Sequence, residues 1–119
     1  VVAGCERLFD MSAAQLFALT PDQQVRLLAR DESTEQARDK ILLYAALCAE
    51  AGRVYADLAN AELARGSRLN ALRLTLRAHR EFADPAPLPV YAPDVTALAA
   101  TLGRDTLDAE TSAWLDESR

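Results

Sequence analysis

Nucleophilic catalysis in this chain would have to use its histidine and its cysteines. His79 is the only histidine, and the two cysteines are Cys5 and Cys48. A cysteine or serine nucleophile needs a base within hydrogen-bonding reach. His79 follows Leu72 and Leu76 on one apolar line of a predicted helix, so we expect it at the edge of a core with one ring nitrogen hydrogen-bonded. We therefore predict no catalytic residue.

Metal and phosphate chemistry also lack their usual sequence patterns. The chain has no CxxC pair, no helical metal-ligand motif and no glycine-rich phosphate loop. Carboxylate pairs such as Asp108 with Glu110 are expected to be solvated. We predict no metal and no cofactor, and keep as an alternative a small-ligand or enzyme site between helices. Its residues would be Tyr44, Cys48, Tyr55 and His79.

Arginines form the most distinctive charge pattern. Arg73, Arg77 and Arg80 are spaced by four and three residues, which places them on one side of a helix. Such a ridge could donate in pairs to carboxylates or phosphates of a partner. It could instead pair with acidic residues of the antiparallel neighbouring helix, which is the commoner situation. The acidic candidates are Glu50, Asp57 and Glu62.

Two aromatic residues near the end of the chain are a second candidate binding feature. Tyr91 belongs to a proline-rich segment, and Trp114 to the last predicted helix. We expect Trp114 to fold back as a lid on the bundle, because tryptophan is usually well buried. Otherwise the tail could insert into a neighbouring protomer or partner as a short helical peptide. With the arginine ridge, these two complete the predicted partner-binding residues.

Composition limits the classes of partner. The net charge of −5 repels phosphate backbones, so we predict no nucleic-acid partner. The longest apolar run, Ile41 to Ala49, is much shorter than the ~20 residues that cross a bilayer. We predict a cytoplasmic domain without a membrane span.

A tetrad near the start of the sequence suggests an alternative location. Val2-Ala3-Gly4-Cys5 resembles the lipobox of bacterial lipoproteins, in which the cysteine is acylated. We expect a chance run of small residues. The alternative is a lipid anchor at Cys5 on an extracytoplasmic accessory protein of a bacterial envelope assembly.

The elements that must position these residues are helical. Half of the residues are hydrophobic, many of them alanine and leucine, while glycine and proline are scarce, which favours packed helices over sheets. We predict one all-α domain: a bundle over 5–83, a proline-rich strap over 84–93, and two short helices over 94–119.

Helix boundaries follow from caps and breaks. The first helix is predicted over Cys5–Leu19, and a short second helix follows a capping box of Thr20 and Gln23. The third is predicted over Thr34–Arg65, and the fourth over Arg68–Phe82 after a Gly66-Ser67 turn. The short helices are predicted over Asp94–Leu102 and Leu107–Glu117. One apolar stripe of the third helix comprises Ile41, Tyr44, Ala45, Cys48, Gly52, Tyr55, Leu58, Ala59 and Leu63.

The third and fourth predicted helices resemble one tetratricopeptide-type hairpin within a non-repeating bundle. In that family an aromatic residue and a leucine-small pair precede a glycine turn, and alanines and a proline follow it. The matching residues are Tyr55, Leu58, Ala59, Gly66, Ala71, Ala78 and Pro85. The resemblance implies a helical scaffold that holds a peptide. From the residues and the resemblance we expect a non-catalytic interaction module, an adaptor or small chaperone-like subunit that binds another protein or itself.

Overall fold

The structure, a computed structural model, describes residues 20–30 and 32–117. The described helices are α3 (Pro21–Ala29), α4 (Thr34–Asp57), α5 (Ala61–Glu81), α6 (Val95–Leu102) and α7 (Ala109–Glu117), with a 3-10 turn η1 (Arg104–Thr106) before α7. No strand occurs in this part of the chain, which confirms the all-α prediction. The predicted helix Cys5–Leu19, and Cys5 with it, lies outside the described residues.

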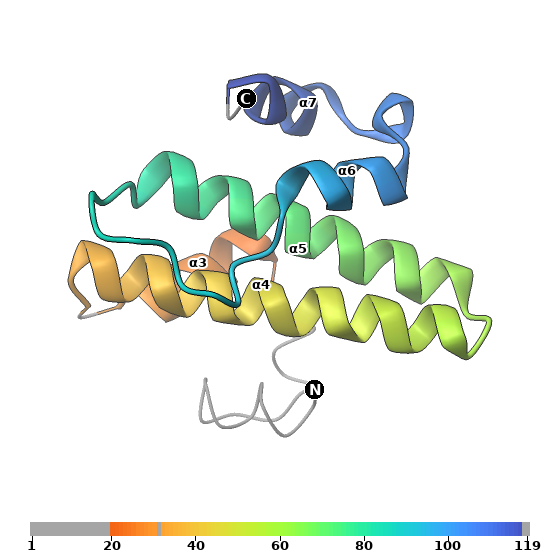
Figure 1. The fold of residues 1–119 in the computed structure, drawn as a ribbon, viewed down its shortest axis with the longest axis horizontal. Coiled ribbons are helices and arrows are strands. Elements are labelled where there is room, and N and C mark those ends of the chain that lie inside the picture. Colours follow the sequence, from red (N-terminus) through yellow and green to blue (C-terminus); the bar gives the residue numbers. More distant parts are fainter. Residues whose placement is uncertain (1–19, 31, 118–119) are drawn as a thin grey trace.

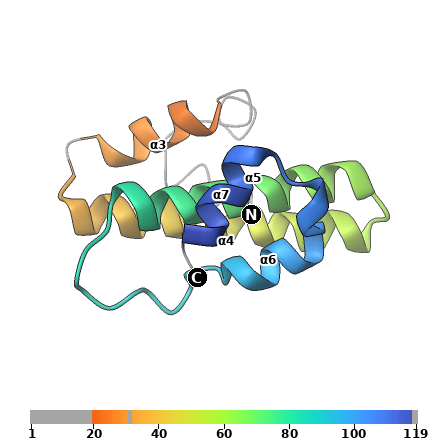
Figure 2. The ribbon, with the colours of Figure 1, turned by 90° about the horizontal axis from the view of Figure 1, so that it is seen from above.

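The long antiparallel hairpin of α4 and α5 is the frame of the molecule (Figure 1). Helix α3 packs against α4 and α5, while α6 and α7 pack on α5. Seen from above, α3 and α6 flank the hairpin on opposite sides (Figure 2). Among the described helices, α5 therefore packs against each of α3, α4, α6 and α7.

Two apolar clusters lie on different faces of α5. The first joins α3, α4 and α5 and contains Val25, Leu28, Ile41, Leu42, Tyr44, Ala45, Cys48, Ala71, Leu74 and Ala78. The second joins α5 to the C-terminal helices and contains Leu72, Leu76, Ala99, Leu102 and Leu115. Residues three or four apart share a helix face. Ala71, Leu74 and Ala78 therefore face the first cluster, while Leu72 and Leu76 face the second.

Three predicted helix boundaries are confirmed by their caps. Thr20 and Gln23 form the predicted capping box at α3. Ser33 caps α4, and Asp94 caps α6 through bonds to two backbone amides. Gly103 ends α6 at a φ of 84°, a conformation that side chains disfavour.

The predicted turn at Gly66-Ser67 is wrong. Helix α4 ends at Asp57 and α5 begins at Ala61, so Gly66 lies inside α5. The turn has Ala59 at a φ of 59°. The Ala59 amide donates to the Ala56 carbonyl (3.0 Å) and the Asn60 amide to the Tyr55 carbonyl (2.8 Å), the two bonds of a Schellman ending.

The sequence did not predict a turn here, because alanine occupies the position where glycine is usual. The Asn60 side chain then accepts from the Leu63 amide (3.1 Å) and starts the next helix. The tetratricopeptide resemblance depends on a glycine turn, and the structure puts Leu58 and Ala59 in the turn and Gly66 elsewhere.

The position of the turn also changes the predicted apolar stripe of the third helix. Its last members, Leu58, Ala59 and Leu63, are exposed at the hairpin tip, and Leu58 retains 70% of its accessible surface. The core of α4 ends earlier, at Cys48 and Gly52. The hairpin tip therefore presents apolar side chains to solvent.

Gly52 lies where α4 and α5 approach each other closely. It is buried within α4, and a Cβ atom there would lie 3.2 Å from the Ala64 carbonyl oxygen and 2.6 Å from Arg68 Cγ. Both contacts are tighter than ordinary van der Waals packing. Gly52 thus makes room for α5 and for the stem of Arg68.

Replacing Gly66 with alanine is expected to raise the free energy of unfolding by about 1 kcal/mol. A Cβ at this exposed helical position meets no atom within 4 Å, so the variant gains helix propensity and restricts the unfolded chain without a clash. Urea unfolding followed by circular dichroism measures the change. Gly52→Ala is the matched variant and should be destabilised, since its Cβ would have no room. A stability loss in Gly66→Ala would contradict the position of the turn.

Candidate functional site

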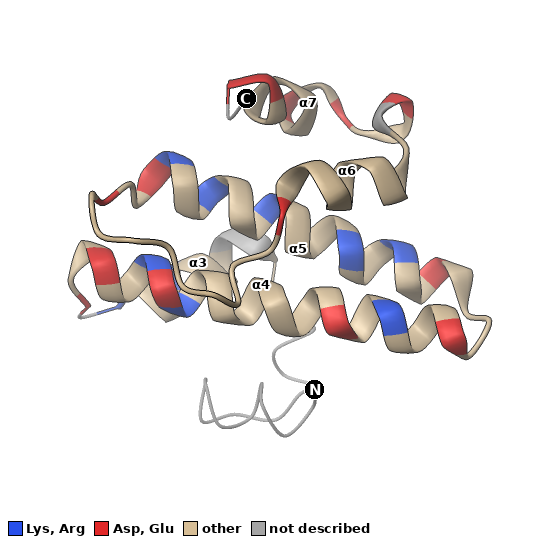
Figure 3. Cartoon of the chain, in the orientation of Figure 1, with Lys and Arg blue, Asp and Glu red and all other residues tan. Residues whose placement is uncertain are grey.

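The arginines of the predicted ridge hold the C-terminal helix. Arg73 donates to Asp108 (3.0 Å) and to the Thr111 hydroxyl (3.4 Å). Arg80 forms an ion pair with Glu117, and its guanidinium carbon lies 5.3 Å from the centre of the Trp114 ring. Figure 3 shows basic residues at intervals along α5 and acidic residues on α7. Arg73 and Arg80 thus contact the C-terminal segment of the chain.

The internal partners of the arginine ridge differ from those expected on the antiparallel helix. Arg77 pairs with Glu81 on its own helix, 3.0 Å away. Glu50 and Asp57 instead pair with Arg53, also along their own helix. The expected pairing does not form. Gly52 lies opposite Ala64 and Arg68, so Glu50 and Asp57 are nearer the hairpin tip than the ridge is, and Glu62 belongs to α5 itself.

Asp108 is the acidic residue most affected by this arrangement. Hydrogen bonds from Thr111, followed by one from Arg73, lower the pKa of Asp108 from 3.8 to about 2. The bond from Thr111 Oγ1 is 2.5 Å long, and the Thr111 amide also donates to this carboxylate (3.3 Å). The ionised carboxylate of Asp108 therefore fixes the start of α7.

Acidification is expected to weaken the docking of α7 through Asp108. The pKa of Asp108 is lower in the folded chain than in the unfolded chain. The ionised carboxylate therefore contributes fully to stability above the unfolded pKa of 3.8, and this contribution is lost as the pH falls through about 2. The group is 45% exposed, so we expect less than about 1 kcal/mol after solvent screening. Asp108→Asn should remove this part of the pH dependence of unfolding between pH 4 and pH 2. An unchanged dependence would contradict the assignment.

The two predicted aromatic residues have different environments. Trp114 packs against the second apolar cluster and is partly buried, as its predicted lid position requires. Tyr91 is 40% exposed, and its hydroxyl donates to the Asp39 carbonyl at 3.4 Å. Burial raises the pKa of the Tyr91 hydroxyl, and Asp39 adds to the effect. Tyr91 thus belongs to the contact between the strap and α4.

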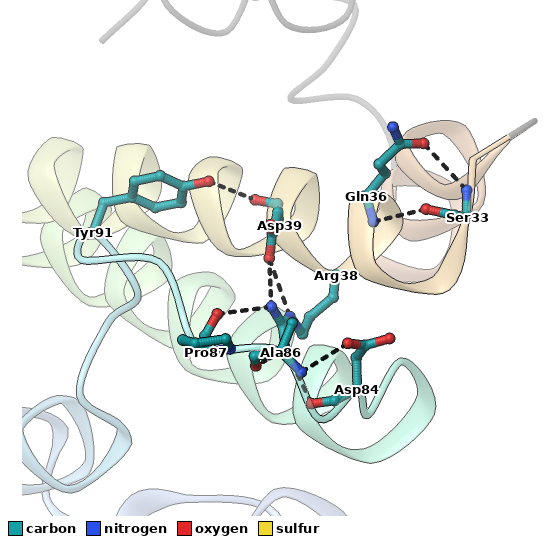
Figure 4. Close-up of polar contacts among 8 residues, drawn as sticks. All are labelled: Ser33, Gln36, Arg38, Asp39, Asp84, Ala86, Pro87 and Tyr91. Carbon is teal, nitrogen blue, oxygen red and sulfur yellow. Dashed lines mark hydrogen bonds and ion pairs between the residues drawn. The ribbon is translucent and has the colours of Figure 1, made fainter.

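Arg38 holds the proline-rich strap, a role that the sequence did not indicate. Its side chain is 2% exposed, and its guanidinium donates to the carbonyls of Asp84 (3.2 Å), Ala86 (3.0 Å) and Pro87 (3.1 Å). It also pairs with Asp39 at 3.0 Å. Figure 4 shows these bonds converging on the guanidinium. A lone arginine among small and acidic neighbours carries no sequence signal for such a role.

The residues of the predicted inter-helix pocket have different surroundings. Tyr44 and Cys48 are buried in the first apolar cluster, and Tyr55 is partly exposed further along α4. His79 lines a different space of about 150 Å³, together with Leu76, Arg80, Trp114 and Glu117. The four residues thus lie in different surroundings within the described part of the chain.

His79 is half-buried at the edge of the core, as its place on an apolar line predicts. Burial lowers the pKa of its imidazole, and nearby Arg38 lowers it further. The expected hydrogen bond does not form with any described residue.

The hairpin tip is the surface that sequence reasoning missed. Val54, Leu58 and Leu63 are 38%, 70% and 48% exposed there. Beside them lies a hollow of about 270 Å³ between the tip and the end of α6. Its lining consists of Ala56, Ala59, Ala61, Ala64, Arg65, Arg68, Thr101 and Leu102.

Comparison with known proteins assigns no relative. The chain matches no protein-family model, no curated protein and no solved structure. The functional argument therefore depends on the geometry alone.

Neither a metal-binding cluster nor a membrane-spanning helix is found among the described residues. Among residues 20–30 and 32–117, no three His, Cys, Asp or Glu side chains gather so that they could hold a metal ion. None of the helices in that part of the chain combines the length and the apolar character needed to span a membrane.

Proposed function

We propose that this domain is a non-catalytic protein–protein interaction module, an adaptor-type helical scaffold that docks a partner at the tip of the α4–α5 hairpin. The observation that carries the proposal is the exposure of three apolar side chains at the end of the hairpin: Val54 in the last turn of α4, Leu58 in the connecting turn and Leu63 in the first turn of α5. Burying a leucine side chain contributes about 1.5–3 kcal/mol. Two or three such anchors at the centre of an interface supply much of a typical binding energy.

The tip suits docking better than the other apolar surface. Leu88, Val90 and Tyr91 are exposed on the strap, but most of that segment is irregular and Arg38 holds its first residues. The tip is formed by two long helices and adjoins a hollow that a partner side chain can enter. Rigid helical elements lose less entropy on binding than mobile segments do.

The experiment compares exposed leucines from the two surfaces. Leu58→Gln combined with Leu63→Gln removes the apolar anchors of the tip, and Leu88→Gln is the matched control on the strap. Both variants should keep the thermal stability of the parent, because these side chains are exposed. Proteins captured by each from the native extract are quantified by mass spectrometry, and the partner is then purified and its affinity measured.

The proposal predicts at least a tenfold loss of one partner in the tip variant and none in the Leu88 variant. Capture of the same proteins in equal amounts by all variants would contradict it.

A further inference from the structure

The hollow beside the hairpin tip is a cationic site in an acidic chain. It has a volume of about 270 Å³, and its described lining includes two arginines, Arg65 and Arg68, and no acidic residue. The chain as a whole has a net charge of −5. Positive charge gathered in a concave site with apolar walls attracts anions. The charge of this hollow therefore favours an anionic ligand.

One face of α5 supplies half of the hollow. Ala61, Ala64, Arg65 and Arg68 lie three or four residues from one another, a spacing that places them on one side of the helix. The other lining residues come from the end of α4, the turn and the end of α6. Both arginines thus share one helix face with the alanines that form part of the wall.

The two arginines of the hollow differ in what they bind. Arg65 donates to the Leu102 carbonyl (3.0 Å), and to the carbonyl (3.2 Å) and hydroxyl (2.9 Å) of Thr106, so it holds the end of α6. Arg68 is half-buried and forms no hydrogen bond and no ion pair with any described residue. A partly desolvated charge without a counterion costs stability. The guanidinium of Arg68 is therefore the group that an anion would neutralise.

Gly52 provides the space for the Arg68 side chain. A Cβ on residue 52 would lie 2.6 Å from Arg68 Cγ and 3.4 Å from its Nε. Glycine within a helix is less stable than alanine, and this glycine is inside the 24-residue helix α4. An unpaired half-buried charge and a helix glycine thus occur at the same place. Local features that lower stability without an evident structural gain are typical of functional sites.

The donors of the hollow match a carboxylate better than a phosphate. The planar edge of a guanidinium donates two parallel hydrogen bonds to the two oxygens of one carboxylate. The Thr101 hydroxyl already donates to the Ala97 carbonyl (3.0 Å), so it has no further proton for an oxyanion. A phosphate would leave oxygens against alanine side chains, whereas the alkyl chain of a carboxylate would pack on them.

We propose that this hollow is a carboxylate-binding site, in which Arg68 pairs with a carboxylate on a short aliphatic chain that packs against the alanines. The chain is short because the hollow is smaller than the pockets of about 300–1,000 Å³ that hold drug-sized ligands. Two sources carry this group: a free short-chain acid and the glutamate side chain of a partner protein. Neither Leu58 nor Leu63 lines the hollow, so the inference does not depend on the docking proposed for the tip.

The test is a titration of the full chain with hexanoate, followed through the amide chemical shifts of the alanines that line the hollow. Hexanamide has the same alkyl chain without the charge, and inorganic phosphate is the alternative anion. Hexanoate should give saturable shifts with a dissociation constant of about 1 mM or lower. Hexanamide and phosphate should bind at least tenfold more weakly, because neither combines a charged pair with apolar packing.

Variants of the chain test the role of Arg68. Arg68→Gln should weaken hexanoate binding about tenfold or more, and Arg68→Lys by less, because lysine keeps the charge without the fork. Arg26→Gln is the matched control, since Arg26 is exposed on α3 and also has no ion pair among the described residues. Gly52→Ala should weaken binding because its Cβ displaces Arg68, whereas Gly66→Ala should not. Each variant is compared at a temperature where circular dichroism shows it to be folded.

A second pair of ligands distinguishes the two sources. Butanoate has the carboxylate arm of glutamate alone, and N-acetylglutamic acid α-amide adds the backbone. Tighter binding of the blocked glutamate assigns the hollow to a partner's side chain, and binding of butanoate at least as tight assigns it to a free acid. Either result supports the carboxylate site.

Three results would overturn the inference: no saturable shift with hexanoate, equal affinity for hexanamide or phosphate, or unchanged affinity in Arg68→Gln. The variant with Leu58→Gln and Leu63→Gln should bind hexanoate like the parent. Its loss of a captured protein without loss of hexanoate binding would show that the two proposals stand or fall separately. Loss of hexanoate binding in this variant would overturn the assignment of the site to the hollow.

Discussion

Arg38→Ala is expected to lower the free energy of unfolding by about 3 kcal/mol, the largest loss from any single polar side chain in the described structure. The parent side chain is 2% exposed and donates to three strap carbonyls. Removing it leaves a cavity and takes the charged donor from each carbonyl, a combination that typically costs several kcal/mol. For a chain of this length the corresponding fall in the melting temperature is roughly 10 °C.

The strap should respond to this substitution before the rest of the fold. Release of residues 84–87 frees the backbone around Tyr91, so limited digestion with chymotrypsin should cut the variant first after Tyr91, because the Leu88–Pro89 bond resists this protease. Arg38→Met restores much of the packing but no hydrogen bonds and should recover only part of the loss. Arg26→Ala, at an exposed arginine of α3, should change stability by less than about 0.5 kcal/mol. A loss below 1 kcal/mol in Arg38→Ala would show that the strap is held by other contacts.

Leu115→Ala is expected to release α7 at a cost of about 3 kcal/mol in docking free energy. Leu115 is fully buried in the second apolar cluster, and truncating a buried leucine typically costs 2–5 kcal/mol. The other contacts of α7 include the ion pairs of Arg73 and Arg80, whose side chains are 36% and 46% exposed. Exposed ion pairs contribute little, so the helix depends on its apolar contacts.

The single tryptophan makes this release measurable. Trp114 lies in α7, so its fluorescence reports the docking of that helix, while circular dichroism reports mainly α4 and α5. In Leu115→Ala the fluorescence transition should move to lower urea than the dichroism transition. Leu42→Ala, at an equally buried leucine of the first cluster, should move both transitions together. Coincident transitions in Leu115→Ala would mean that α7 and the hairpin unfold as one unit.

These predictions divide the molecule into a frame and the parts attached to it. The α4–α5 hairpin and α3 share the first apolar cluster, and the C-terminal helices share the second. Three arginines of α5 hold the C-terminal part: Arg65, Arg73 and Arg80. The predicted ridge therefore has an internal use.

Local signals predicted the helices whose ends carry caps. The Thr20–Gln23 and Ser33–Gln36 boxes, Asp94 and Gly103 act within four residues, and that range is visible in a sequence. The all-α class followed from the same kind of evidence, since alanine and leucine at helical spacing favour packed helices.

The hairpin turn and the surfaces were decided by tertiary contacts. Gly66 carries the stronger turn signal, but the turn forms at Leu58–Asn60, where Ala59 adopts a positive φ. A helix start at Ala61 buries Ala64 beside Gly52, and the gain from packing two long helices exceeds the cost of one alanine in that conformation. That shift moved Leu58 and Leu63 from the predicted core to the surface.

The sequence by itself thus determined the helical class, the capped boundaries and the position of the strap, because those depend on residues near each other in the chain. Contacts between distant segments decide which arginines of α5 hold the C-terminal part and that Arg38 holds the strap. Each of these depends on groups brought together from distant parts of the chain, for example the 46 residues that separate Arg38 from Asp84, and helical spacing carries no information over such separations.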